Sequence, residues 1–157
     1  MIYIQRAYNN SHSLRIFTTS GGFIMIKLII GGKGSGKTKT LIDLVNTAAV
    51  STKGSVVCIE KGDKLNLDII HKARLIDTDY YAVRDAGTLY GFVAGILASN
   101  SDITDIFVDS TLKICAQDAN ALADILPKID AITKDINFVM TVSLALEECP
   151  EGIKAYA

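Results

Sequence analysis

The chain has 157 residues, enough for one domain whose hydrophobic core needs no metal or disulfide support. Its formal net charge is −1, and this near balance carries no clear signature of binding to nucleic acid or to an anionic membrane. The longest helix-like apolar run, LYGFVAGILA at 89–98, is shorter than the roughly 18 residues of a bilayer-crossing helix, so we expect no membrane span.

Residues 1–24 differ from the rest of the chain, because they contain no acidic residue and no hydrophobic periodicity. One interpretation is an organelle transit peptide, which is also basic and poor in acids. The other is a translated leader in a bacterial gene. The codons for GGFIM would place a purine-rich ribosome-binding sequence just before the codon for Met25. Under either interpretation we set residues 1–24 aside as a non-native or poorly ordered leader and expect a single domain over 25–157.

From Met25 onward, short apolar runs alternate with segments of helical periodicity. Pro127 falls inside one predicted helix and is expected to kink it or split it in two. Strands alternating with helices, with near-continuous apolar strands, predict an α/β fold with a mostly parallel sheet covered on both faces. The predicted strands are 25–31, 54–60, 73–77, 104–109 and 136–144, and the predicted helices are 37–50, 85–100, 116–135 and a short one from Pro150.

The sequence GGKGSGKT at 31–38 fits the pattern G-x-x-x-x-G-K-[ST] and lies between a predicted strand and a predicted helix. Glycines let successive backbone N–H groups point toward one centre, where the start of the helix adds further N–H groups and a positive dipole. In such a loop Lys37 contacts the β- and γ-phosphates and the Thr38 hydroxyl binds Mg²⁺. The predicted nucleotide-binding residues are Gly31, Gly32, Lys33, Gly34, Ser35, Gly36, Lys37, Thr38 and Lys39.

A phosphate loop of this kind needs a carboxylate at the end of another strand to hold Mg²⁺. Asp109 follows the apolar run IFV, and Asp77 follows the less apolar run ARLI. We favour Asp109 as the metal-binding residue and keep Asp77 as the alternative, whose other interpretation is a carboxylate that caps a strand or loop.

With IIGGKGSGKT as the phosphate loop and IFVD as the metal-binding strand, the chain resembles the P-loop nucleoside triphosphatases. This resemblance implies a three-layer P-loop fold of the RecA-like kind and a cytoplasmic protein with ATP and Mg²⁺ as cofactors. More narrowly, the segments MIKLIIGGKGSGKTKTLIDLVN and LYGFVAGILASNSDITDIFVDSTLKI are similar to small single-domain bacterial ATP-binding proteins, some of which are labelled twitching-motility ATPases.

Hydrolysis needs a group that orients the attacking water, and many RecA-like ATPases have a glutamate directly after the metal-binding aspartate. Here Ser110 occupies that position, so Glu60 is the candidate catalytic carboxylate beside Lys37; its other interpretation is an ordinary solvated glutamate. Thr141 and Ser143 are either sensor-like donors to the γ-phosphate or simple inward-facing polar residues.

The sequence therefore predicts a Mg²⁺-dependent ATPase that is weak or stimulated by a partner, with a protein partner or a second copy left open. The GTPase motif N-K-x-D is absent from the sequence, which favours adenine as the base. The alternatives are a nucleotide-dependent switch without hydrolysis and a small-molecule kinase. Arg74 and Arg84 are the only arginines after Met25, which argues against an arginine-rich kinase lid.

The cysteines Cys58, Cys115 and Cys149 are widely spaced and form no C-x-x-C pair. We expect them to be reduced thiols packed as small apolar residues, as in a cytosolic protein, rather than zinc ligands or disulfide partners.

Overall fold

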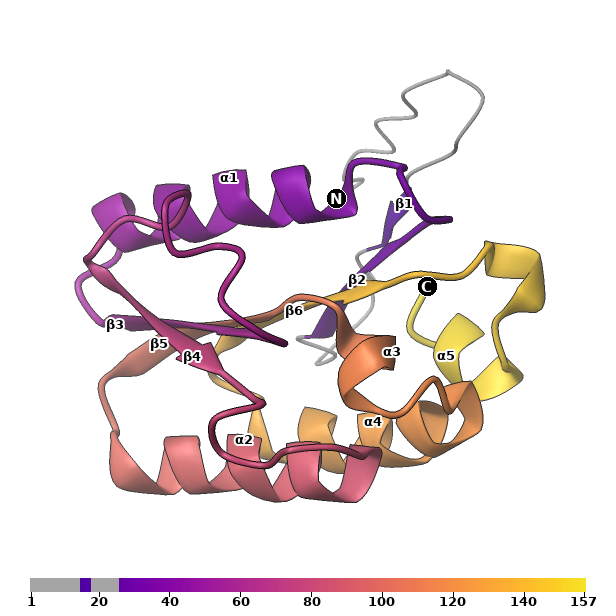
Figure 1. Ribbon diagram of the computed structural model, residues 1–157. Helices are drawn as coiled ribbons and strands as arrows, with labels where there is room; N and C mark the ends of the chain where they lie inside the picture. The colour runs from indigo at the N-terminus through magenta and orange to yellow at the C-terminus, as the bar shows by residue number, and fades with distance from the viewer. Residues whose placement is uncertain (1–14, 18–25) are drawn as a thin grey trace, which may run out of the picture.

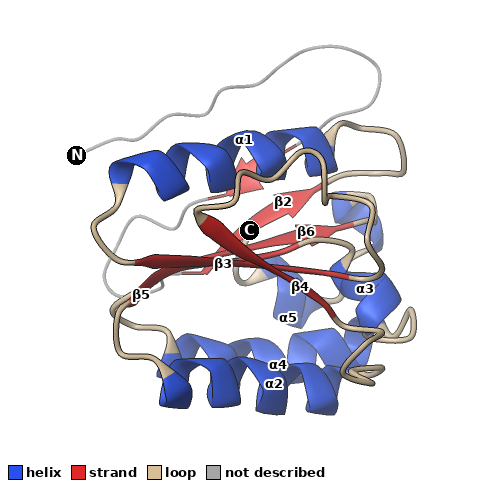
Figure 2. Ribbon diagram, turned by 60° about the vertical axis from the view of Figure 1, so that its left-hand side comes forward, coloured by secondary structure: helices blue, strands red, loops and turns tan. Residues whose placement is uncertain are grey.

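A computed structural model of the chain describes residues 15–17 and 26–157, and it has a three-layer α/β architecture. A central sheet lies between helix α1 (Lys37–Ser51) on one face and helices α2 (Ala86–Ser99) and α4 (Ala119–Ile132) on the other (Figure 1; Figure 2). This confirms the predicted α/β class with helices on both faces of the sheet.

The sheet has six strands in the order β1-β2-β6-β5-β3-β4. All neighbouring pairs from β2 to β4 in this order are parallel, whereas the edge strand β1 pairs antiparallel with β2. The strands are β1 (Arg15–Phe17), β2 (Ile26–Ile30), β3 (Ser55–Glu60), β4 (Ala73–Asp77), β5 (Ile103–Val108) and β6 (Asn137–Val142).

The edge strand β1 belongs to the segment that the sequence analysis set aside, and no strand was predicted there. The remainder of residues 1–24 lies outside the described residues, so the leader stays a prediction.

Three features of the helical layer differ from expectation. Helix α4 continues through Pro127 as one helix, so of the two predicted effects of this proline, a kink or a split, the split is wrong. Pro127 itself is exposed. Two short helices were not predicted, namely α3 (Thr111–Ile114), directly after β5, and the 3₁₀ turn η1 (Leu146–Glu148). The short helix expected from Pro150 is present as α5 (Glu151–Lys154), with Pro150 as its N-cap residue.

Side chains from alternate positions of the strands form two apolar clusters, one on each face of the sheet. On the α1 side, Phe107 and Val139 pack with Leu41 and Val45 of the helix. The larger cluster on the other side joins the strands to α2, α3, α4 and α5. Near-complete burial of both faces explains why the parallel strands read as continuous apolar runs.

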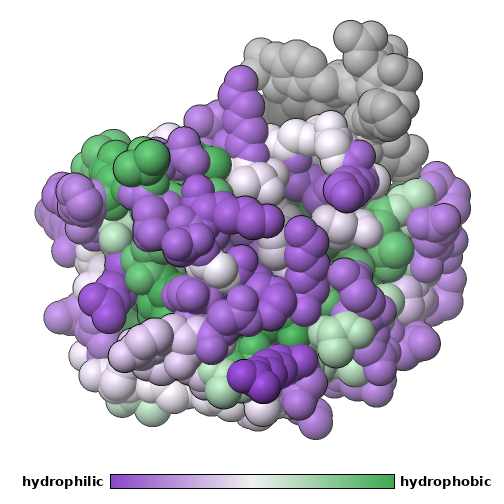
Figure 3. Space-filling model, in the orientation of Figure 1, coloured by the Kyte–Doolittle hydropathy of each residue, from purple (hydrophilic) through white to green (hydrophobic). Residues whose placement is uncertain are grey.

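Residues 61–72 connect β3 to the parallel strand β4 through turns rather than a helix. Leu65 and Ile69 anchor this connection in the apolar cluster on the α1 side, whereas Leu67 is 99% exposed. The surface seen from the side of Figure 1 is mostly hydrophilic, with apolar side chains in separate patches (Figure 3). Within the described residues, no helix combines the length and the hydropathy needed to cross a bilayer.

Candidate functional site

Polar residues gather where the parallel strands end, on the face of the sheet that α1 covers. Side chains two positions apart along a strand lie on the same face, so these residues share the side of Phe107 and Val139. Because all these strands run in the same direction, their carboxyl ends meet at one edge of the sheet, the usual ligand-binding edge of α/β folds. In spatial order they are Thr141 on β6, Asp109 after β5, Glu60 on β3 and Asp77 on β4.

The glycine-rich loop is curled between β2 and α1 rather than extended. Gly31 N–H donates to the Val142 carbonyl of β6 at 3.2 Å, and Ser35 N–H donates to the Gly32 carbonyl at 3.3 Å. Gly34 has φ +79° and Gly36 has φ +89°, which is the left-handed region that other residues adopt only with strain. The glycines at these two positions therefore provide the turn from which α1 begins at Lys37.

Lys37 is 6% exposed, and its ammonium group folds back onto the loop. Its Nζ donates to the Gly32 carbonyl at 2.8 Å and lies 3.3 Å from the Ser35 hydroxyl. Burial lowers the pKa of Lys37, and the negative charge of Asp109 acts in the opposite direction. A buried ammonium with only neutral hydrogen-bond partners favours the approach of an anion, which would compensate the lost hydration.

Thr38 and Asp109 meet across the end of β6. The Thr38 hydroxyl lies 3.2 Å and 3.3 Å from the two Asp109 carboxylate oxygens, and Thr141 donates its hydroxyl to Asp109 Oδ1 at 2.9 Å. Ser110 N–H in turn donates to the Thr141 hydroxyl at 2.9 Å. One carboxylate and one hydroxyl suit Mg²⁺, which keeps several waters and takes further oxygens from phosphates.

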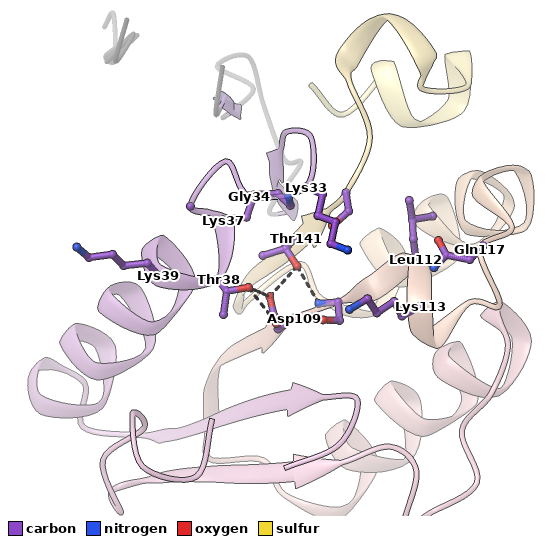
Figure 4. A pocket seen from close by; sticks show the side chains of 13 residues that line it. Lys33, Gly34, Lys37, Thr38, Lys39, Asp109, Leu112, Lys113, Gln117 and Thr141 are labelled. Carbon is purple, nitrogen blue, oxygen red and sulfur yellow. Dashed lines mark hydrogen bonds between the residues drawn. The ribbon is translucent and has the colours of Figure 1, made fainter. Parts of the chain in front are cut away.

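A cavity of about 590 Å³ opens at this point, as Figure 4 shows from close by. It brings together most of the residues predicted from the glycine motif, and Asp109 is the carboxylate among the residues that line it. Gly31, Gly32 and Ser35 act on the loop itself through hydrogen bonds. The lining residues are Lys33, Gly34, Gly36, Lys37, Thr38, Lys39, Asp109, Ser110, Leu112, Lys113, Gln117, Thr141 and Ser143.

Glu60 lies next to this group but is not among the residues that line the cavity. It is 2% exposed, and its carboxylate accepts a hydrogen bond from Leu65 N–H at 3.1 Å. Burial raises the pKa of Glu60, and the nearby charges of Asp109 and Asp77 raise it further, against the effect of the Leu65 hydrogen bond. In this arrangement Glu60 fastens the start of the 61–72 connection, and its catalytic role stays a prediction.

Asp77 holds two turns at the far edge of the sheet. Its Oδ1 accepts hydrogen bonds from the N–H groups of Gly62 and Asp79, both at 2.8 Å. Asp77 is not among the residues of the cavity wall. These contacts favour the interpretation of Asp77 as a loop-capping carboxylate over its alternative as a metal ligand.

Sequence reasoning missed the wall of the cavity opposite the glycine loop. This wall is formed by the segment around α3, which contributes Lys113 and Gln117. A helix of four residues is too short to show helical periodicity in the sequence. The residues with left-handed backbone at its two ends are Ser110, Ala116 and Gln117, and none of them is the glycine that would indicate a turn. The signal available in the sequence was Lys113, which follows closely after Asp109, the residue predicted to bind the metal.

The three cysteines are free and buried, as predicted. Burial raises the pKa of each thiol, that of Cys115 to about 12, so none is a reactive thiolate at neutral pH. Among the described residues there is no cluster of three or more histidine, cysteine or acidic side chains that could hold a metal by itself.

Comparison of the chain with protein-family models, with curated proteins and with solved structures found no match.

Proposed function

We propose that this chain is a P-loop nucleoside triphosphatase of the RecA-like kind that binds ATP with Mg²⁺ and hydrolyses it slowly or when a partner stimulates it. The observation that carries the proposal is the contact between Thr38 and Asp109 at the mouth of the curled glycine loop. These two residues are 71 positions apart in the chain, yet they meet where the motif requires an Mg²⁺-binding hydroxyl and carboxylate.

Each part of the site has a role in this proposal. The N–H groups of Gly32, Lys33, Gly34 and Gly36 surround the phosphates, whereas those of Gly31 and Ser35 hold the loop in its curled form. Lys37 leaves its carbonyl partner to contact the β- and γ-phosphates. Thr38 and Asp109 hold Mg²⁺, which when bound neutralises charge on the β- and γ-phosphate oxygens. Thr141 orients Asp109 through its hydroxyl, so the carboxylate is fixed before a ligand arrives.

The weak or stimulated activity follows from the position of Glu60. Its carboxylate faces the same side of the sheet as Asp109, but the Leu65 side of the connection covers it. Glu60 orients a water for attack on the γ-phosphate only after residues 61–65 move aside. A partner or a second copy of the chain that displaces this connection would provide such stimulation.

The small number of buried, unreactive thiols suits action in the bacterial cytoplasm.

The second candidate function is a switch that binds nucleotide without hydrolysis. One observation favours it. Among the described residues of the cavity wall, Asp109 is the carboxylate, and it is already hydrogen-bonded to Thr38 and Thr141, so it is not placed to orient the attacking water. A kinase has less support, since Arg74 and Arg84 are both outside that wall. Phosphate release by the wild-type protein, compared with Glu60→Gln, separates hydrolysis from binding alone.

Isothermal titration calorimetry tests nucleotide binding itself. We expect Mg²⁺-dependent binding of ATP by the wild-type protein and a loss of about 10–100-fold in affinity for Lys37→Ala, because a charge-assisted hydrogen bond to phosphate contributes roughly 1.5–3 kcal/mol. Asp109→Asn is expected to weaken mainly the dependence on Mg²⁺. Lys53→Ala, at an exposed lysine beyond the far end of α1, is the control.

Two results would count against the proposal. If Lys37→Ala binds ATP as tightly as the wild-type protein, the glycine loop is not the phosphate site. If Asp109→Asn leaves the Mg²⁺ requirement unchanged, Asp109 is not the metal-binding carboxylate, and Asp77→Asn becomes the variant to measure.

A further inference from the structure

The cavity has a second cationic wall that the phosphate-loop motif does not account for. It lies directly after Asp109 in the chain and is formed by Ser110, Leu112, Lys113 and Gln117, of which Lys113 carries the charge. Lys33, Lys37 and Lys39 come from the glycine loop and the start of α1 on the other wall. A ligand in the cavity therefore meets positive charge from two directions.

The backbone of this second wall is strained at both ends of α3. Ser110 has φ +55°, Ala116 +55° and Gln117 +62°, and none of the three is glycine. Left-handed backbone at such residues costs roughly 1–2 kcal/mol each. Strain of this kind persists only where the surroundings impose it, and it concentrates at ligand sites.

The surroundings of α3 do impose its position. At its start, Ser110 N–H donates to the Thr141 hydroxyl at 2.9 Å, and at its end Gln117 N–H donates to the Leu112 carbonyl at 2.7 Å. Leu112 and Ile114 are buried in the larger apolar cluster. The helix is thereby fixed with its buried residues toward the core and Lys113 exposed on the cavity side.

Lys113 is free to take a ligand. Within the described part of the chain it makes no side-chain hydrogen bond and no ion pair. In Figure 4 its side chain extends from α3 toward Asp109, whereas Lys39 points away from that group. If Asp109 holds a metal ion that also contacts the γ-phosphate, that phosphate would lie on the side of the cavity toward which Lys113 extends.

We propose that Lys113 binds the terminal phosphate of the nucleoside triphosphate and makes the site select triphosphate over diphosphate. This inference rests on the proposed function and adds a residue to it. The diphosphate fills the glycine loop and contacts Lys37 but leaves Lys113 without a partner. The triphosphate bridges the two walls and brings α3 into contact with the ligand.

The test compares the affinities of ATP, its non-hydrolysable β,γ-imido analogue and ADP in the presence of Mg²⁺, by calorimetry on the full chain. We expect Lys113→Ala to lower affinity for the two triphosphates about tenfold or more and to leave ADP affinity within twofold. This loss corresponds to one charge-assisted hydrogen bond. Lys113→Arg is expected to restore most of the difference. Lys128→Ala, at an exposed lysine on α4, is the matched control.

A structural effect of the substitution would change ADP and ATP affinity together, so the ratio of the two is the decisive quantity. If Lys113→Ala changes neither affinity, or both equally, while the wild-type protein binds ATP, the inference is overturned and the proposed function stands. If the wild-type protein binds neither nucleotide, the proposed function fails, and the role of Lys113 fails with it.

Discussion

Glu60 is a carboxyl group in an environment that opposes its charge. It is buried, it lies near Asp109 and Asp77, and the hydrogen bond from Leu65 N–H compensates only part of this cost. Its pKa is raised above the ordinary value of 4.5. At pH values between 4.5 and the raised pKa, Glu60 therefore keeps its proton in the folded protein but has released it in the unfolded chain. The contribution of Glu60 to stability is therefore fully present below pH 4.5 and is lost as the pH rises through the raised pKa.

Glu60→Gln removes this titration and keeps an oxygen that accepts from Leu65 N–H. We expect the melting temperature of the variant, relative to the wild-type protein, to rise as the pH increases from about 4 to about 7, because only the wild-type chain then loses the stability linked to its proton. Glu147→Gln, at an exposed position, serves as the control for replacing a carboxylate by an amide. A difference that stays constant with pH would show that Glu60 does not titrate in this way.

At the scale of elements, the start of β3 is pressed against the start of β5. A Cβ at Gly54 would lie 2.5 Å from the Asp102 carbonyl oxygen, and this oxygen accepts a hydrogen bond from Ser55 N–H at 2.8 Å. The pairing register of the two strands also shifts between Ser55 and Val56. The close approach therefore involves backbone that cannot move without losing strand pairing.

Gly54→Ala is expected to reduce the free energy of unfolding by about 1–3 kcal/mol, the usual cost of forcing extra volume into a packed contact. The matched substitution is Gly95→Ala in the middle of α2, where a Cβ meets no atom within 4 Å beyond the backbone of its own helix. It should raise stability by about 1 kcal/mol, because alanine is the better helix former. Urea denaturation measures both. Equal effects of the two substitutions would contradict the close contact at Gly54.

The sequence predicted these elements well where periodicity and local chemistry agree. The glycine motif located the end of β2 and the start of α1 at Lys37, and the run before Asp109 located β5. Helix α3 was beyond reach, because its left-handed flanking residues are not glycines and its position depends on the contact between Ser110 and Thr141. The burial of Glu60 and its hydrogen bond from Leu65 N–H likewise depend on how the 61–72 connection packs, which no local sequence pattern predicts.

At the scale of the whole molecule, the candidate site exists only when the sheet is assembled. Its groups lie at the carboxyl ends of β2, β5 and β6, and these strands become neighbours through parallel pairing. The contact between Thr38 and Asp109 crosses the end of β6, so unfolding of the sheet separates the two residues. A ligand of this site binds the folded state alone and must stabilise the entire domain.

Under the proposed function, Mg²⁺-ATP therefore raises the melting temperature of the protein. At a ligand concentration 100 times the dissociation constant, the gain is about 2.7 kcal/mol. For a domain of this size it corresponds to a rise of roughly 5–10 °C, since each kcal/mol shifts the midpoint by about 2–4 °C. AMP, which lacks the β- and γ-phosphates, should give a much smaller rise at the same concentration.

Thermal unfolding followed by circular dichroism provides the measurement, and Lys37→Ala provides the control. Since Lys37 is the buried cation of the loop, its removal should reduce the rise with Mg²⁺-ATP to about half or less while leaving the ligand-free protein folded. A 10–100-fold weaker affinity leaves a gain of only about 0.4–1.4 kcal/mol at the same ligand concentration. An equal rise in the wild-type and Lys37→Ala proteins would mean that ATP binds elsewhere on the surface. The same rise with AMP as with ATP would mean that the β- and γ-phosphates do not contribute to the binding energy.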